Sequence, residues 1–237
     1  MRLTLVLAIL ALTSLSSWAE IQLVPYSAKY TATYDAGWFP ISVDARRTLQ
    51  QVENGQWKIS FEAYSSIADF SESSTFTFDN HVIPQSYQYK TTGFFSKKYR
   101  AKTFDWENKT VLLDNKTPAD YALTQHMLDS ISYQEQMRFD LMQGKKTMAY
   151  EVAYKSRIKE FEFEVEGTDT FNSNQVQIDA VKVRQTNHKN KRERTYIWFA
   201  KDHDFIILKL VLVDRHGDKN TIVLKRAQIG EQNIELK

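Results

Sequence analysis

Apolar and polar residues alternate along most of this chain. Between Tyr26 and Tyr34 every second residue is tyrosine or alanine, and the residues between them are polar. The stretches 57–63 and 160–166 repeat the pattern, the second with glutamate at every polar position. A period of two with one polar face is typical of a half-buried strand, and such strands form antiparallel sheets with one solvated face.

Turn-forming residues separate further stretches of strand character. The clearest turn is Asn54-Gly55, because both residue types tolerate the positive φ of a tight hairpin. Between residues 175 and 187 the apolar phase slips by one position, which predicts a β-bulge near Asp179. The further predicted strands are 41–52, 71–79, 82–92, 97–106, 109–113, 147–155, 175–187, 194–201, 204–214 and 219–228.

The stretch 204–214 departs from the alternation. Between Phe205 and Val213 the only charged residue is Lys209, and all the others are apolar. Such a run is typical of a strand that is covered on both faces. We therefore expect the deepest part of the core here, with a helix covering one face of the strand.

One helix is predicted, from about residue 129 to residue 143. Asp129 or Ser130 provides an N-cap, and Ser132 and Glu135 have the spacing of a capping box. A glycine directly after the last position provides a stop. The apolar stripe of this segment is imperfect and contains methionine, which is typical of a helix that packs on a sheet.

These patterns predict a mostly β protein. The expected architecture is a curled antiparallel sheet or half-open barrel with one main covering helix, at about residues 129–143. No internal repeat, low-complexity tract or Pro/Gly-rich linker divides the chain, so we expect residues 20–237 to form a single β-rich domain.

Residues 1–19 have the features of a secretory signal. Arg2 supplies a positive charge, residues 3–12 are apolar, and Ala19 ends a stretch of small residues. A membrane anchor is the alternative, but spanning a bilayer requires about twenty apolar residues. We expect cleavage after Ala19 and export to the periplasm, and no later segment is long enough to span a membrane.

The absence of cysteine and the charge balance narrow the function further. Without cysteine, this sequence has no cysteine-linked lipid anchor, disulfide, thiolate metal site or cysteine nucleophile. The formal net charge is +2, and removal of residues 1–19, whose one charged residue is Arg2, leaves +1. A dedicated nucleic-acid-binding protein concentrates positive charge, so no nucleic-acid partner is expected.

No arrangement of catalytic residues stands out. None of the five histidines lies two to four residues from another, so no local pair of metal ligands is present. There is no Gly-x-Ser-x-Gly motif and no glycine-rich phosphate loop. The glutamates of 160–166 fit a solvated strand face better than an acid–base pair. An enzyme is therefore the least expected class, and neither a metal site nor a cofactor is expected.

Two segments combine cations with other features of a contact surface. In residues 94–100 two phenylalanines precede three cations, which fits an amphipathic loop tip or a strand start with its aromatics packed inward. Residues 188–194 are either a solvated hairpin tip or a contact for anionic lipid headgroups or polysaccharide. The candidate contact residues are Phe94, Phe95, Lys97, Lys98, Arg100, Lys189, Lys191 and Arg192.

Three short motifs resemble those of one bacterial family. They are residues 24–30 (VPYSAKY), residues 128–133 (LDSISY) running on to Arg138, and residues 194–202 (RTYIWFAKD). On these motifs the chain is similar to the domain of unknown function 3108 family, whose members are exported proteins of Gram-negative bacteria. The resemblance implies a curled antiparallel sheet and a location outside the cytoplasm, and it implies no activity.

Two functions are consistent with this picture. The first is the binding of a hydrophobic or amphipathic envelope molecule, such as a lipid, on the concave face of the sheet. The second is a structural or assembly factor that contacts an envelope protein or polysaccharide. A cavity of roughly 300–1,000 Å³ favours the first, and an exposed apolar patch or open sheet edge favours the second. The candidate lining residues, which could equally form a sealed core, are Tyr26, Tyr30, Tyr34, Trp57, Phe61, Phe161, Phe163 and Trp198.

Overall fold

A computed structural model describes residues 22–35, 40–65, 68–93, 97–172 and 177–236. These residues form fifteen strands and one α-helix, α1 (Ser132–Met142). The strands are β1 (Tyr26–Asp35), β2 (Pro40–Gln51), β3 (Trp57–Tyr64), β4 (Ala68–Phe78), β5 (Val82–Gly93), β6 (Lys98–Asp105), β7 (Thr110–Leu113), β8 (Thr117–Ala122), β9 (Thr147–Tyr154), β10 (Arg157–Asn172), β11 (Gln177–Gln185), β12 (Arg194–Ala200), β13 (Ile207–Val213), β14 (Lys219–Ile229) and β15 (Gln232–Glu235). The predicted signal segment 1–19 and the residues Phe94 and Phe95 lie outside the described residues.

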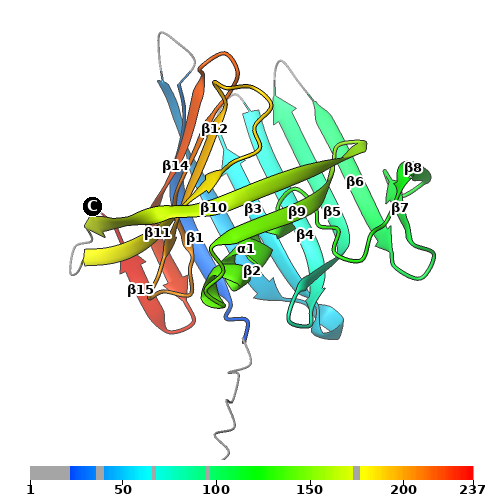
Figure 1. Ribbon diagram of the computed structural model, residues 1–237, viewed down its shortest axis with the longest axis horizontal. Coiled ribbons are helices and arrows are strands. Elements are labelled where there is room, and N and C mark those ends of the chain that lie inside the picture. The colour runs from blue at the N-terminus through cyan, green and yellow to red at the C-terminus, as the bar shows by residue number, and fades with distance from the viewer. Residues whose placement is uncertain (1–21, 36–39, 66–67, 94–96, 173–176, 237) are drawn as a thin grey trace, which may run out of the picture.

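All the strands belong to one curled antiparallel sheet. Its order is β8-β7-β6-β5-β4-β3-β2-β1-β14-β13-β12-β11-β10-β9, and β15 pairs with β14. The long strand β10 crosses in front of the sheet with β9 beside it, and it contacts β8 at the other end of the strand order (Figure 1). No strand pairing joins β8 to β9 in the described sheet, so the sheet does not close into a barrel. The predicted fold class is thus confirmed.

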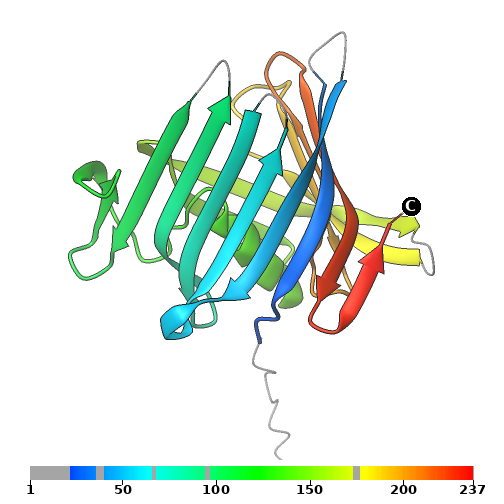
Figure 2. The ribbon, with the colours of Figure 1, turned by 180° about the vertical axis from the view of Figure 1, so that it is seen from behind.

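The helix occupies the hollow of the curled sheet. It lies between the wall formed by β1 to β5 and the crossing strands β9 and β10, as the views from both sides show (Figures 1 and 2). It contacts β5 on one side and β9 on the other. The single covering helix that the sequence predicts is therefore present, and it covers the concave face of the sheet.

The alternation along the chain decides which side chains reach this hollow. In β1, Tyr26, Ala28 and Tyr30 are buried, whereas the residues between them are exposed or half-buried. Ile59 of β3 and Phe76 of β4 are fully buried in the same way. Because successive side chains of a strand point to opposite faces, one face of each strand builds the core and the other meets solvent.

Several local predictions are confirmed and some are corrected. Asn54 (φ 58°) and Gly55 (φ 70°) both have positive φ in the turn between β2 and β3, as predicted. In β13 both faces are largely buried, since Leu208 is fully buried and Val211 is 7% exposed. The bulge expected near Asp179 is wrong, because the register of the β10–β11 pair shifts in β10 instead, between residues 165 and 167. The two short strands β8 and β15 were not predicted, since each has too few apolar residues to show a pattern.

The start of the helix differs from the predicted capping box. Asp129 Oδ1 accepts hydrogen bonds from the backbone N–H groups of Ile131 (3.0 Å) and Ser132 (2.9 Å), and Ser132 Oγ accepts one from the N–H of Asp129 (2.9 Å). Asp129 and Ser132 therefore form the reciprocal pair, and Glu135 is free to make other contacts. At the other end Gly144 has a φ of 79°, as expected for the residue that ends a helix.

In the described part of the chain, no helix has the length and apolar character needed to cross a membrane.

Candidate functional site

A pocket lies on the concave face, next to the first turn of α1. Its volume is about 190 Å³. Polar and apolar side chains from β1 to β4, from the helix and from β13 and β14 surround it. The lining residues are Tyr30, Arg47, Phe61, Phe70, Glu72, Ile131, Gln134, Ile207, Leu210, Leu212 and Ile222.

The two long walls of the pocket are apolar. On one wall Phe61 meets Phe70 edge to face, with ring centres 5.9 Å apart, and Phe70 meets Tyr89 in the same way at 5.4 Å. On the other wall Leu210 and Ile222, a direct cross-strand pair, face the cavity. Aromatic and aliphatic walls of this kind are typical of sites that hold the apolar part of a ligand.

The mouth of the pocket carries an exposed apolar row. Ile41 pairs with Tyr34, Tyr34 with Asn220, and Asn220 with Leu212 across neighbouring strands. The exposed fractions of Ile41, Tyr34 and Leu212 are 48%, 44% and 38%. Among the described residues these are three of the five large apolar side chains that are exposed, and together they extend the apolar surface from the pocket to solvent.

A buried network of charges holds the helix in place beside the pocket. Glu135 of α1 accepts from Arg47 Nη2 at 2.9 Å and from Arg138 Nη1 at 2.8 Å, and all three side chains are at most 6% exposed. Burial would raise the pKa of Glu135, but Arg138 and Arg47 outweigh this effect and hold the pKa below its usual value. A buried ion pair of this kind is costly to break, because one partner is then left as an unpaired buried charge.

Arg47 lines the pocket, and each of its three side-chain nitrogens donates to another residue of the protein. Its Nε donates to Tyr26 Oη (2.9 Å), its Nη1 to Gln134 Oε1 (2.8 Å) and its Nη2 to Glu135. Tyr26 Oη in turn donates to Glu135 Oε1 at 2.7 Å. The guanidinium therefore serves the network between β2 and the helix.

Glu72 is the acidic residue that lines the pocket. It accepts a hydrogen bond from Tyr87 Oη at 2.6 Å. Burial raises the pKa of Glu72 to about 7, although the hydrogen bond from Tyr87 and the nearby charges of Arg47 and Lys102 favour the ionised form. The carboxyl group therefore changes its protonation near neutral pH.

The structure distributes the predicted lining residues over three places. Tyr30 and Phe61 line the pocket, and Tyr34 lies at its mouth. Tyr26 and Trp57 belong to the core around the helix. Phe161 and Phe163 pack on Tyr133, with ring centres 5.2 Å and 5.9 Å from it.

Trp198 lies on the other face of the sheet. It pairs with Lys209, whereas the next residue along β13, Leu210, faces the pocket. Its Nε1 donates to Asp169 Oδ2 at 2.5 Å, and the ammonium groups of Lys182 and Lys209 lie 5.5 Å and 5.0 Å from its ring centres. Trp198 therefore does not reach the pocket.

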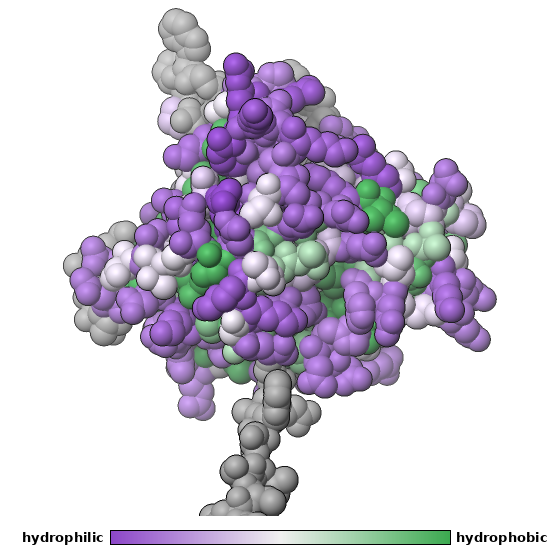
Figure 3. Space-filling model, in the orientation of Figure 1, coloured by the Kyte–Doolittle hydropathy of each residue, from purple (hydrophilic) through white to green (hydrophobic). Residues whose placement is uncertain are grey.

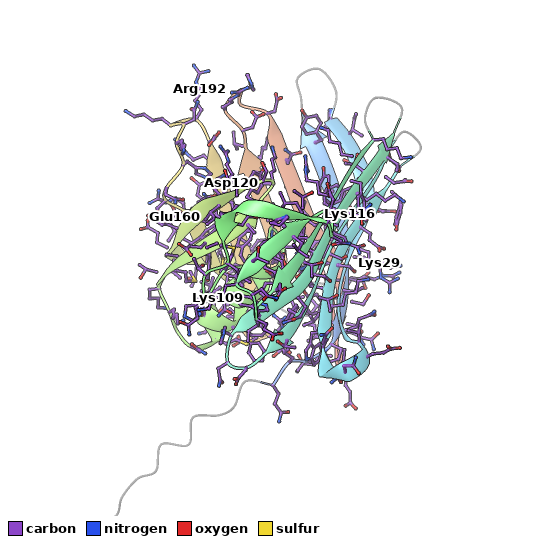
Figure 4. The ribbon with its side chains drawn as sticks, turned by 90° about the vertical axis from the view of Figure 1, so that its right-hand side faces the viewer. Lys29, Lys109, Lys116, Asp120, Glu160 and Arg192 are labelled. Atoms are coloured by element: carbon purple, nitrogen blue, oxygen red, sulfur yellow. The ribbon has the colours of Figure 1, made fainter. Side chains whose placement is uncertain are left out.

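The predicted contact residues are also separated. Lys97 and Lys98 are exposed, but Arg100 faces the concave side, with its guanidinium carbon 4.9 Å from the centre of the Tyr89 ring. Lys191 and Arg192 are exposed in the loop before β12, and Figure 4 shows Arg192 and Glu160 on the opposite side of the molecule from Lys29.

A second cleft lies beside the basic loop. Its volume is about 510 Å³, and Lys189 lines it together with Arg157, Lys159 and Glu193. Polar side chains cover most of the face that carries β9 and β10, with apolar side chains showing between them (Figure 3). Ile158 is the one apolar residue among the nine that line the cleft, so the cleft is more polar than the pocket beside α1.

Sequence reasoning missed the polar residues of the concave face. Arg47 and Glu72 occupy the inward phase of β2 and β4, and a charged residue in a mainly apolar phase was the available signal. It also missed the approach of His81 and His126, whose ring centres are 5.4 Å apart. No group of three or more metal-ligating side chains occurs among the described residues.

Comparison with solved structures finds a similar fold. The β-barrel-like protein of domain of unknown function DUF1849 from Brucella abortus has a TM-score of 0.62 and 12% identity, with 90% of this chain and 100% of that chain covered. At this identity the likeness concerns the fold alone.

Two further structures are much less similar. A DUF1089 family protein from Pseudomonas aeruginosa has a TM-score of 0.34 and 8% identity, over 80% of this chain and 91% of that one. An outer membrane lipoprotein-sorting protein domain from Vibrio parahaemolyticus has a TM-score of 0.24 and 8% identity, over 86% and 85%. Neither TM-score is high enough to indicate a shared fold.

No curated protein matches the sequence significantly. The family comparison gives a clear result, since residues 29–224 match the family described as "Protein of unknown function (DUF3108)". This match covers most of the chain and includes the helix and nearly all of the sheet. The chain therefore belongs to the DUF3108 family.

Proposed function

We propose that this chain is an exported, non-catalytic binding protein that holds the apolar part of an amphipathic envelope molecule in the concave-face pocket. The observation that carries the proposal is the pocket of about 190 Å³ between the first turn of α1 and the sheet. This volume is below the roughly 300–1,000 Å³ of a site that encloses a whole ligand, and the proposal is therefore confined to the apolar part of the ligand, for which apolar walls with few polar groups are suited.

The mouth of the pocket supports the same function. An apolar ligand needs a path from solvent, and the row of Ile41, Tyr34 and Leu212 provides an apolar entrance. Asn220 lies between Tyr34 and Leu212 in this row, so the apolar surface is small and adjoins the pocket instead of forming a broad patch for a protein partner. The entrance and the pocket together match a ligand that is partly inserted and partly exposed.

The proposed location rests on residues 1–19. A positive charge at Arg2, the apolar run 3–12 and the small residue Ala19 have the order of a secretory signal. Export through a cleaved signal would place the mature chain in the periplasm, where envelope amphiphiles are available as ligands.

A non-catalytic role is supported by how the polar groups near the pocket are used. Arg47 and Glu135 hold the helix on the sheet, and Asp129 caps it. These groups stabilise the fold, so Glu72 is the titratable residue of the lining that keeps an unpaired atom, and a single carboxyl group does not make an acid–base pair.

Native mass spectrometry of the protein purified from the periplasm of producing cells tests this proposal. We expect a retained small-molecule mass in the wild-type protein. In Leu212→Trp the larger side chain would narrow the mouth of the pocket and reduce the retained fraction. Tyr99→Trp is the matched control, because Tyr99 is 55% exposed and lies on the opposite face of β6 from the inward-facing Arg100.

The proposal would be contradicted by protein that carries no small molecule and takes up no added single-chain amphiphile. A stoichiometric protein partner in place of a small molecule would instead favour an assembly role.

A further inference from the structure

Glu72 forms the polar end of the pocket. It lies between Phe61 and Tyr89, its direct cross-strand neighbours on β3 and β5. Tyr87 Oη donates to Oε1 of Glu72, and Oε2 has no hydrogen-bond partner among the described residues. Oε2 is not one of the fully buried polar atoms that lack a partner, so it is open to the cavity. An unpaired acceptor thus faces the space that we assign to a ligand.

The other polar groups of the pocket wall are satisfied by the protein. Arg47 uses Nε, Nη1 and Nη2 for Tyr26, Gln134 and Glu135. Gln134 accepts from Arg47 through Oε1 and donates through Nε2 to the hydroxyl of Tyr133 at 3.4 Å. Of Arg47, Gln134 and Glu72, it is Glu72 that has an acceptor atom without a hydrogen-bond partner, Oε2, and a donor on a ligand can use it.

The charged groups that face Glu72 from the neighbouring elements are engaged as well. Lys102 of β6 donates to the backbone oxygen of Ala153 at 2.5 Å and lies over the ring of Tyr87. Asp129 accepts from Ser74 Oγ at 2.5 Å in addition to capping the helix. Arg47 and Lys102 are close enough to favour the ionised form of Glu72, and Arg100, which faces the same side, lies over the ring of Tyr89.

The size of the pocket limits the apolar part of the ligand. A volume of about 190 Å³ is below the roughly 300–1,000 Å³ of sites that enclose drug-sized molecules. The exposed row at the mouth lets a longer chain continue toward solvent. One alkyl chain fits these limits, and the two chains of a diacyl lipid do not.

From these contacts we infer that the ligand is a single-chain amphiphile whose head group donates a hydrogen bond to Glu72 Oε2. The head group is an alcohol or an amine, and not an ionised carboxylate or a phosphate. This inference rests on the proposed binding function. An ionised acid would place two acceptors against each other in a partly buried site, which leaves both unsatisfied.

Isothermal titration calorimetry at pH 8 with octan-1-ol, octylamine and octanoate tests this inference. We expect octan-1-ol or octylamine to bind the wild-type protein at least about tenfold more tightly than octanoate, because a hydrogen bond to a charged group is gained and an acceptor clash is avoided. In Glu72→Gln the preference for the donor ligands falls by about tenfold. Glu62→Gln is the matched control, because Glu62 follows Phe61 in β3 and so lies on the other face.

The outcomes distinguish a failure of the proposed binding function from a failure of the role assigned to Glu72. If none of the three ligands binds, the proposed binding function is wrong. If the chains bind but octanoate binds as tightly as octan-1-ol, or Glu72→Gln leaves the ratio unchanged, the function stands and the assignment of Glu72 is overturned. A stronger octylamine signal identifies an ammonium head group and a stronger octan-1-ol signal a hydroxyl, and both support the inference.

Discussion

Arg47 of β2 and Glu135 of α1 form a buried ion pair at 2.9 Å that joins the wall of the sheet to the helix inside its curl. The two residues are 88 positions apart in the chain. Arg138, one turn further along the helix, completes the cluster at 2.8 Å. The helix is thus located on the concave face by charge pairing as well as by apolar contact.

Removal of the Glu135 carboxylate should destabilise the fold strongly. Glu135→Gln leaves Arg47 and Arg138 buried without a counter-charge, so we expect the free energy of unfolding to fall by about 3–5 kcal/mol. Urea unfolding followed by circular dichroism measures this change. Lys145→Ala is the control, because its ion pair with Asp140 is about half exposed on the lysine side and should contribute less than about 1 kcal/mol. Equal losses of unfolding free energy in the two variants would show that the Arg47–Glu135–Arg138 cluster does not hold the helix.

The raised pKa of Glu72 predicts a pH-dependent stability. The pKa rises from 4.5 to about 7 on folding, so the folded state binds the proton more tightly than the unfolded state does. The resulting stabilisation is complete below pH 4.5 and is lost as the pH rises through 7. Between pH 5 and pH 8 the unfolding free energy of the wild-type protein should fall by about 2 kcal/mol more than that of Glu72→Gln.

Chemical unfolding of both proteins at the two pH values gives this difference. Lys102, whose pKa burial lowers to about 8, and the other titrating groups remain in both proteins, so their contributions largely cancel. If the unfolding free energies of the wild type and the variant change in parallel with pH, Glu72 ionises as freely in the folded state as in the unfolded chain.

Two substitutions of the capping residue Asp129 distinguish the contribution of its charge to stability from the contribution of its hydrogen bonds. Asp129→Ala removes the acceptor for the backbone N–H groups of Ile131 and Ser132 and for Ser74 Oγ. We expect a loss of about 2–3 kcal/mol of unfolding free energy. Asp129→Asn retains one acceptor oxygen and should lose clearly less, and a loss as large as that of the alanine variant would assign the stabilisation to the charge. Both changes can be read from urea unfolding midpoints at a constant slope.

The alternation of side chains was sufficient to predict the sheet, because a period of two depends on local sequence alone. Ile59 and Phe76 are buried where their phase predicts. The capping residue Asp129 was equally visible, since caps act over three positions. Contacts between neighbours in the chain were therefore accessible from the sequence.

The site was less accessible, because its contacts join distant segments. Glu72 lies in a mainly apolar phase, but the sequence does not reveal that Tyr87 satisfies one of its oxygens and leaves the other open. Phe61 alternates with polar residues, whereas Trp198 lies in an apolar run, and only the curl of the sheet decides that Phe61 faces the pocket. The side that is concave depends on bulges and on long-range pairing, such as that between β1 and β14.

Phe61 and Trp198 therefore provide a test of which face binds. Phe61→Ala removes part of the aromatic wall, so we expect a clear decrease in the retained small molecule by native mass spectrometry and in octan-1-ol affinity. Trp198→Phe removes the hydrogen bond to Asp169 and should cost about 1 kcal/mol of stability while leaving binding unchanged, because this side chain lies on the other face. Unfolding in urea verifies that both variants are folded under the binding conditions. Loss of binding in Trp198→Phe with retention in Phe61→Ala would move the binding site from the concave face of the sheet to its outer face.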